Sequence, residues 1–271
     1  MRATVMSAVQ IFLVEFGSTW IFIRDVLLAW ILNFKKTFPL VVNQITNLAI
    51  RSLSTVAFSG FFIGSILVMQ FNMMLSQYDA QSLLGGLNTS STLREVGPLM
   101  ISFLLAGKVG AFTTAELATM SVTEQFDAIR CLGKDPIEYV IVPRFIAIVV
   151  CSLFLLGFGL FIGVVGSMFI ADVMFEINVL QYISTISRFL SAWTIVGGGI
   201  KSFVYGLVVA SVSTYKGYKA SGGARGVGKA VTESAVFINL FIIFANAFTS
   251  VILDTAQDLT SEFFKTYWGG R

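Results

Sequence analysis

The stretch Phe145-Ile-Ala-Ile-Val-Val-Cys-Ser-Leu-Phe-Leu-Leu-Gly-Phe-Gly-Leu-Phe-Ile-Gly-Val-Val-Gly-Ser-Met-Phe-Ile-Ala171 contains no charged side chain. A helix that crosses a bilayer needs about 20 mostly apolar residues, so this stretch is long enough to span a membrane. The rest of the chain fits that environment, because 56% of its 271 residues are hydrophobic and only 12% are charged. A chain this apolar cannot cover its surface with polar groups in water. We therefore expect a membrane protein.

Four further stretches have the same character. Residues 53–75, 96–115 and 234–253 are mostly apolar over the length of a span, and residues 193–214 are as well except for Lys201 near the middle. We find no internal repeat and no separate soluble domain. The sequence therefore predicts an all-α integral membrane protein with five transmembrane helices.

The N-terminal segment is less clear-cut. Residues 5–34 are apolar but are interrupted by Glu15 and by the adjacent Arg24 and Asp25, so no charge-free run reaches the roughly 18 residues of a span. Several polar residues fall roughly on one helical face: Glu15, Ser18, Thr19, Asp25 and Lys36. We favour an amphipathic interfacial helix over a sixth span. The segment lacks the pattern of a cleavable signal, so we expect it to be retained.

Positively charged residues gather in alternate connections between the spans, and this bias predicts orientation. The basic segments contain Lys35, Lys36, Arg51, Arg130, Lys134, Arg144, Lys216, Lys219, Arg225 and Lys229. We expect these segments and the N-terminus to be cytoplasmic, and the loops 76–92 and 172–192 and the C-terminus to lie on the outer side. The chain then divides into an N-terminal interfacial segment (1–50), a transmembrane domain (51–255) and a C-terminal tail (256–271).

Several classes of function are disfavoured by composition. The chain has no histidine, which removes His-based catalytic triads and His-ligated metals. Cys131 and Cys151 have no metal-ligand spacing, so we expect no metal site. The net charge of +3 is too small to indicate a nucleic-acid partner. No nucleophile stands beside an obvious base, and we expect no catalytic residue in this chain.

Residues 121–132 predict a short helix outside the membrane. Ser121 and Glu124 have the spacing of a capping box, and Gly133 suits a left-handed helix end. Val122, Phe126 and Ile129 form an apolar face. The opposite side is polar and carries Thr123, Glu124, Gln125, Asp127 and Arg130. From this pattern alone, docking to a partner and a simple interfacial connector are equally good interpretations.

A series of motifs in this region occurs in a characteristic order. They are Arg94-Glu-Val-Gly-Pro98, Ala106-Gly-Lys-Val-Gly110, Ala115-Glu-Leu-Ala-Thr-Met120, Val122-Thr-Glu-Gln-Phe-Asp-Ala128, Asp135-Pro136, Val142-Pro-Arg144, Ile200-Lys-Ser202, Gly206, Tyr215-Lys-Gly-Tyr218 and Gly222-Gly-Ala-Arg-Gly-Val-Gly228. Over about residues 90–250 the chain resembles the MlaE-type permease family. Several motifs that agree in order make a chance resemblance improbable.

The resemblance implies the membrane subunit of an ABC transporter that moves phospholipid between a bacterial inner membrane and an MCE-domain carrier. Such a permease works as a homodimer with a cytoplasmic ATPase, and ATP and Mg²⁺ are held by that partner, not by this chain. The helix at 121–132 resembles the coupling helix that contacts the ATPase, so Thr123, Glu124, Gln125, Asp127 and Arg130 are its expected contact residues. A different apolar cargo such as a sterol, a non-transporting scaffold and a membrane-embedded enzyme are the alternatives.

Charges inside the predicted spans are informative because they are costly there. Lys201 lies about 10 Å from either end of its helix, where an unpaired ammonium costs at least several kcal/mol. The resemblance places Arg94 and Glu95 at the mouth of a lipid cavity. We expect Arg94, Glu95 and Lys201 to line that cavity and to interact with a lipid head group or with one another. The alternative is that Lys201 snorkels to an interface while Arg94 and Glu95 cap a helix.

Two departures from the family pattern bear on Lys201. The family often has an acidic residue before this lysine and another in the last span, where this chain has Thr194 and Asn246. The counter-charge of Lys201 is therefore left open by the sequence.

Two further patterns have a functional and an ordinary interpretation. Met74, Leu75 and Tyr78 belong to an apolar stripe on the first span, which suits either acyl-chain contact or packing. The segment Gly223-Ala-Arg-Gly-Val-Gly-Lys-Ala230 nearly matches a phosphate-binding loop, but Ala230 lacks the hydroxyl that holds magnesium. We interpret this segment as a glycine-rich tight turn.

Overall fold

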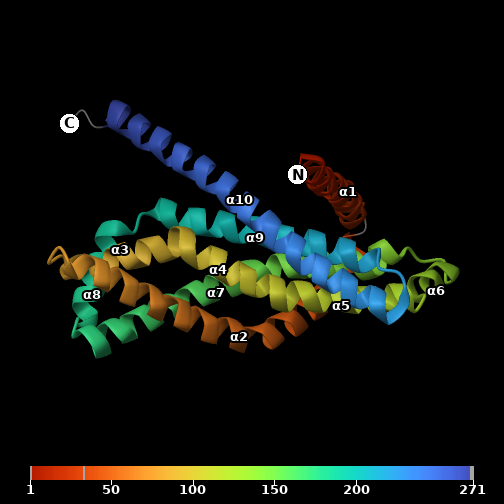
Figure 1. Ribbon diagram of the computed structural model, residues 1–271, viewed down its shortest axis with the longest axis horizontal. Coiled ribbons are helices and arrows are strands. Elements are labelled where there is room, and N and C mark those ends of the chain that lie inside the picture. Colours follow the sequence, from red (N-terminus) through yellow and green to blue (C-terminus); the bar gives the residue numbers. More distant parts are fainter. Residues whose placement is uncertain (1, 33, 269–271) are drawn as a thin grey trace. The chain divides into compact units, whose positions relative to one another are not determined.

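The computed structural model describes residues 2–32 and 34–268, and the side chains of residues 14, 17–31 and 37–259. The described chain consists of helices joined by short connections, and its described residues form no strand (Figure 1). The α-helices are α1 (Arg2–Leu32), α2 (Phe34–Ser76), α3 (Leu84–Ser91), α4 (Gly97–Leu105), α5 (Ala111–Val122), α6 (Gln125–Cys131), α7 (Val142–Phe175), α8 (Val179–Phe189), α9 (Ala192–Tyr218) and α10 (Gly223–Trp268). A 3₁₀ turn occupies Gln81–Leu83, and π-helical turns occupy Thr92–Val96, Ala106–Gly110 and Ile137–Ile141.

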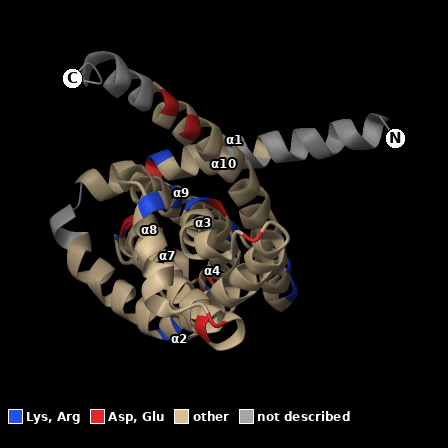
Figure 2. Ribbon diagram, turned by 90° about the vertical axis from the view of Figure 1, so that its left-hand side faces the viewer, with Lys and Arg blue, Asp and Glu red and all other residues tan. Residues whose placement is uncertain are grey.

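The five predicted spans are confirmed. Five helical segments of the described chain are long and apolar enough to cross a membrane: Thr37–Ser76, Gln81–Val122, Ile137–Phe175, Ala192–Tyr218 and Gly223–Leu259. Each contains one of the apolar stretches and extends beyond it at both ends. The helices are longer than the apolar stretches because backbone hydrogen bonding continues past the point where side chains become polar. Lysine, arginine, aspartate and glutamate occupy only short stretches of the described ribbon (Figure 2).

The chain forms two compact units. Unit 1 comprises residues 1–50, 106–151 and 207–238, and unit 2 comprises residues 51–105, 152–206 and 239–271. The long helices α2, α7, α9 and α10 each contribute residues to both units. The predicted division at residues 50 and 255 concerns membrane topology, and it stays a prediction.

In unit 2, α2 and α7 approach each other closely through small residues. A Cβ added at Gly60 would lie 2.4 Å from the carbonyl oxygen of Gly159, and one added at Gly64 would lie 1.8 Å from that of Gly163. Ser167 Oγ donates a hydrogen bond to the Gly64 carbonyl oxygen at 2.9 Å. This spacing of small residues every fourth position lets membrane helices pack backbone to backbone, where dispersion and short polar contacts replace the hydrophobic effect.

A second cluster in unit 2 joins α3 and α8. Tyr182 of α8 is 1% exposed, and its hydroxyl accepts a hydrogen bond from Asn88 Nδ2 at 2.9 Å. The ring packs in an apolar core with Leu75, Leu84 and Val68. The short helix α8 is therefore held against α3 by a buried polar contact and by apolar packing.

In unit 1, hydroxyl groups join α5, α9 and α10. Thr114 Oγ1 lies 2.8 Å from Ser234 Oγ and 3.2 Å from the Ser213 carbonyl oxygen, and all three residues are buried. The predicted N-terminal helix is present as α1, but Thr19 is buried, not on an exposed polar face. Glu15 and Lys36 lie outside the described side chains. The interfacial position of α1 stays a prediction.

Candidate functional site

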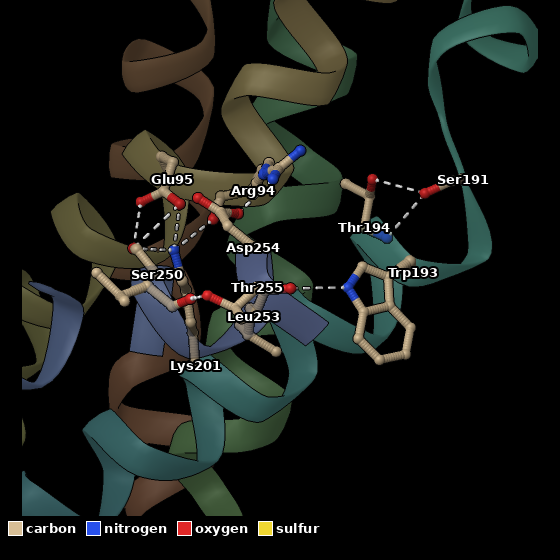
Figure 3. Close-up of polar contacts among 11 residues, drawn as sticks. Arg94, Glu95, Ser191, Trp193, Thr194, Lys201, Ser250, Leu253, Asp254 and Thr255 are labelled. Carbon is tan, nitrogen blue, oxygen red and sulfur yellow. Dashed lines mark hydrogen bonds and ion pairs between the residues drawn. The ribbon is translucent and has the colours of Figure 1, made fainter. Parts of the chain in front are cut away.

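Lys201 is the centre of a buried polar cluster in unit 2. Its side chain is 1% exposed, and Nζ donates to Glu95 Oε1 at 2.5 Å, to Ser250 Oγ at 2.9 Å and to the Arg94 carbonyl oxygen at 2.9 Å (Figure 3). An ammonium group has three protons to donate, so these three acceptors satisfy it. The snorkelling alternative for Lys201 is therefore wrong, since its charged end is buried and hydrogen-bonded.

The counter-charge of Lys201 is Glu95, which comes from the π-helical turn Thr92–Val96. Such a turn inserts an extra residue into a helix and changes the direction in which the following side chains point, and it often marks a functional site. Ser250 Oγ contacts both carboxylate oxygens of Glu95, at 3.1 and 3.0 Å. Glu95 is thus fixed from two sides, although its side chain is still 37% exposed.

A second ion pair lies beside the first. Arg94 Nη2 pairs with Asp254 Oδ1, and the two side chains are 39% and 51% exposed. Nearby, Trp193 Nε1 donates to the Leu253 carbonyl oxygen at 3.2 Å (Figure 3). The space among these side chains is about 10 Å³, which is barely enough for one water molecule. The charged groups are therefore paired with one another and leave little room for a ligand between them.

The last span presents a polar stripe to this cluster. Asn246, Ser250 and Asp254 follow one another at intervals of four residues on α10, so they share one helical face. Tyr205 Oη donates to Asn246 Oδ1 at 2.5 Å, four residues beyond Lys201 on α9. Sequence reasoning missed Ser250 and Asp254 as site residues. The interval of four between polar residues in an otherwise apolar span is the signal that marks them.

The structure brings Arg94, Glu95 and Lys201 together as expected, but not Met74, Leu75 and Tyr78. Leu75 is buried in the apolar core with Tyr182, whereas Met74 and Tyr78 are 61% and 74% exposed. None of the three lines the space around Lys201. Their proposed contact with acyl chains stays a prediction.

The helix predicted at 121–132 begins later than expected, at Gln125. The predicted capping box between Ser121 and Glu124 does not form. Ser121 lies in the last turn of α5, and its hydroxyl donates to the carbonyl oxygens of Tyr218 and Ala220, at 3.1 and 2.8 Å. Glu124 precedes α6 with a φ of 59°, in the left-handed region. The Ser121 hydroxyl bonds to carbonyl oxygens at the end of α9, so it does not cap α6 as the local pattern predicts. The glycine end is confirmed, since Gly133 has a φ of 71°.

The apolar face of α6 packs as predicted. Phe126 is 5% exposed, and its ring centroid lies 5.1 Å from that of Tyr218. Arg130 donates to Tyr218 Oη at 2.8 Å and to Asp127 at 2.6 Å. The predicted partner-facing residues Thr123, Glu124, Gln125, Asp127 and Arg130 are all exposed. Tyr218, which sequence reasoning quoted only as part of a motif, holds this helix by both its ring and its hydroxyl.

The glycine-rich segment at 223–230 is helical, which corrects the expected tight turn. The turn is confined to the residues just before α10, where Gly222 has a φ of 94°, and α10 begins at Gly223 with a φ of 67°. A phosphate-binding loop needs backbone N–H groups that point at the ligand. Beyond the first turn of a helix these groups bond to preceding carbonyls, so the segment does not have that form.

Comparison with known proteins identifies one matching family model and several related proteins. The family model described as Permease MlaE matches residues 41–252. A probable ABC transporter permease protein of Rickettsia felis is 34% identical over 76% of this chain and 80% of its own length. The intermembrane phospholipid transport system permease protein MlaE of Haemophilus influenzae is 31% identical over 78% of this chain and 81% of its own length. Protein TRIGALACTOSYLDIACYLGLYCEROL 1, chloroplastic, of Arabidopsis thaliana is 34% identical over 75% of this chain and 58% of its own length.

Proposed function

Because this chain belongs to the MlaE permease family, we propose that it moves phospholipid between a bacterial inner membrane and an MCE-domain carrier. It is a membrane permease subunit of an ABC transporter, not an enzyme. The cargo proposal rests on one observation: two ion pairs lie side by side within the spans, and one of their cations is buried whereas the other is accessible.

The two cations differ in what they can do for a phosphate group. Lys201 is 1% exposed and makes three hydrogen bonds, so separating it from Glu95 would leave a buried ammonium without its counter-charge. Arg94 is 39% exposed and its partner Asp254 is 51% exposed. Arginine binds phosphate through two parallel N–H donors. We assign the phosphate contact to Arg94, with Asp254 as the displaceable counter-ion and Lys201 as the residue that fixes Glu95.

A phospholipid head group does not fit in a space of about 10 Å³, so the cluster has to open for cargo to bind. A partner that binds one arrangement more tightly than the other can shift that equilibrium. The partner we propose is the cytoplasmic ATPase, which would hold ATP and Mg²⁺ itself. Its docking surface on this chain is the exposed polar side of α6, formed by Thr123, Glu124, Gln125, Asp127 and Arg130.

The functional unit we propose is a homodimer, and the exposure of α10 supports it. Only 11% of the apolar window of α10 is buried within the chain, against 56% for those of α7 and α9. One face of α10 carries large exposed apolar side chains: Leu240, Phe244, Phe248, Val251 and Ile252. A second copy of the chain can cover this face symmetrically.

We propose that the N-terminus is cytoplasmic and the C-terminus periplasmic. The basic segments assigned to the cytoplasm fall in unit 1, apart from Arg51 at the start of unit 2. The loops 76–92 and 172–192 and the C-terminal end of α10 fall in unit 2. This separation of the basic segments supports the orientation given by the positive-inside rule.

The test is a transport assay with the complex of permease, ATPase and MCE-domain carrier in phosphatidylethanolamine vesicles. Arg94→Gln should abolish ATP-dependent phospholipid transfer, and Arg94→Lys should recover part of it because the charge remains. Asp254→Asn should keep transfer. Arg188→Gln is the matched control, since Arg188 is an exposed arginine of α8 outside this cluster.

The alternatives give different results in the same assay. If the cargo is a sterol, transfer of a labelled sterol will continue in the Arg94→Gln complex, because a sterol has no phosphate. If the chain is a scaffold, neither lipid will move in the unaltered complex. Equal phospholipid transfer by Arg94→Gln and the unaltered chain overturns the assignment of Arg94.

A further inference from the structure

A second cavity in unit 2 is unlike the charged cluster. It has a volume of about 440 Å³, within the roughly 300–1,000 Å³ typical of small-molecule sites. The cavity shares only Thr194 with the space around Lys201. Its other lining residues come from α3, the π-helical turn after it, α7, α8, the connection from α8 to α9, and α9. We call it the α7–α9 groove.

The lining residues form one continuous face on each helix. On α7 they are Leu153, Gly157, Leu160, Phe161 and Val164, and on α9 they are Thr194, Ile195, Gly198, Gly199 and Ser202. In each set, neighbouring lining residues are one, three or four positions apart. This spacing places the set on one side of its helix. Ile186 of α8 and Leu190, the residue that follows this helix, add two more lining residues. The groove is therefore built by matched faces of neighbouring helices.

The groove has a buried floor and exposed walls. Leu160, Thr194 and Ser202 are nearly buried, at 7%, 7% and 2% exposed. Phe161 and Ile195 are 64% and 60% exposed. Its width comes from missing side chains, because a Cβ built at Gly157 or at Gly199 would meet nothing within 4 Å.

The few hydroxyls along the groove already have partners. Ser202 Oγ donates to the Gly198 carbonyl oxygen at 2.7 Å, and Thr194 Oγ1 lies 3.2 Å from Ser191 Oγ. Thr89 Oγ1 lies 3.4 Å from Tyr182 Oη. The groove therefore offers packing surface without an unpaired polar group or a charge. Its ligand must be apolar and slim.

We propose that the α7–α9 groove binds one acyl chain of a phospholipid from the surrounding bilayer, independently of the cargo site at Arg94. The lining faces of α7 and α9 belong to membrane-spanning helices, so hydrocarbon is the solvent at the open side of the groove. A slim acyl chain matches a channel left by absent side chains, whereas a helix about 10 Å across does not. A second copy is better accommodated on the exposed face of α10.

The strength of such a site comes from shape. Lipid tails outside the groove are as apolar as the groove itself, so transfer between them gains little hydrophobic free energy. Close packing on several sides adds dispersion contacts that a flat lipid-facing surface does not provide. Filling the groove with a side chain should therefore remove the site and leave the fold intact.

The experiment uses the full chain in phosphatidylethanolamine nanodiscs that contain a trace of phosphatidylethanolamine with a diazirine on one acyl chain. After illumination, labelled residues are mapped by mass spectrometry. In the unaltered chain, labels should concentrate on residues 153–164 and 194–202 compared with Phe58 and Phe62 of α2, which are exposed and lie outside the groove. Equal labelling at both places means ordinary lipid contact and overturns the proposal.

Two groove-filling variants provide the decisive comparison. Gly157→Leu and Gly199→Leu should each lower labelling of the groove by about tenfold, which corresponds to about 1.4 kcal/mol of binding free energy. Gly107→Leu is the matched control, since a Cβ at Gly107 also meets nothing within 4 Å and Gly107 lies in a different span outside the groove. A thermal unfolding profile like that of the control shows that a variant is folded. Unchanged labelling in both folded variants overturns the proposal.

A disulfide test separates the acyl chain from a second copy of the protein. Phe161→Cys is placed in a Cys131→Ser background, because the native Cys131 is exposed. We expect no covalent dimer on oxidation in nanodiscs. Efficient dimer formation through residue 161 would show that another copy covers the groove, and this would overturn the lipid proposal without affecting the cargo site.

Discussion

The Lys201 ammonium and the Glu95 carboxylate lie 2.5 Å apart although their residues are 106 positions apart in the sequence. The two partners differ in burial, because Lys201 is 1% and Glu95 37% exposed. Removing Lys201 and removing Glu95 should therefore reduce the stability of the protein by different amounts. An uncompensated charge is most destabilising where it cannot reach a polar environment.

We predict that Glu95→Gln destabilises the protein more than Lys201→Met. Glu95→Gln leaves the buried ammonium without its counter-charge and should cost about 3 kcal/mol. Lys201→Met leaves a carboxylate that is partly exposed and still contacts Ser250, so the cost should be smaller. The double variant should recover much of the loss. Thermal unfolding of the purified chain measures all three, and additive losses would show that the pair is not coupled.

The contact between α2 and α7 should be intolerant of any side chain at Gly64. Gly64→Ala places a Cβ against the Gly163 carbonyl oxygen and disturbs the hydrogen bond from Ser167. Separation of the two helices should cost about 1–3 kcal/mol, as overpacking in a close-packed core does. Gly107→Ala is the control with open space around its Cβ. If the two variants unfold at the same temperature, the close approach does not contribute to stability.

Tyr218 should hold α6 more by its ring than by its hydroxyl. Tyr218→Phe loses the bond from Arg130, which is exposed, and should cost no more than about 1 kcal/mol. Tyr218→Ala also loses the packing against Phe126 and Phe22 and should cost about 3 kcal/mol. Binding of the purified ATPase partner should follow the same order. Weaker binding by Tyr218→Phe than by Tyr218→Ala would contradict this order.

The end of α6 should require a residue that tolerates a left-handed backbone. Gly133 has a φ of 71° and a Cβ there would meet nothing within 4 Å, so only the backbone conformation is at issue. Gly133→Ala should cost roughly 1–2 kcal/mol, whereas Gly133→Asn should cost less because asparagine adopts this conformation more readily. Hydrogen exchange of residues 125–131 measures the effect. If both variants protect these residues as well as the unaltered chain does, the glycine is dispensable.

The sequence by itself determined the membrane class, the five spans and the family. These conclusions depend on the length of apolar runs and on motif order, which are local and survive any arrangement of the helices. It also determined the glycine end of α6 and the burial of Phe126, because both follow from positions within one turn or one helical face. The motifs further singled out Arg94, Glu95 and Lys201 as residues of one site.

Only the tertiary structure decided how those charges are used. The partner of Lys201 comes from a π-helical turn, whose extra residue no helical periodicity anticipates. Two other outcomes were also not anticipated by the sequence. The Ser121 hydroxyl bonds to the end of α9, and Leu75 packs in the core beside Tyr182. In each case the outcome depends on which residue a distant part of the chain brings near. That choice is a matter of three-dimensional packing and leaves no local pattern in the sequence.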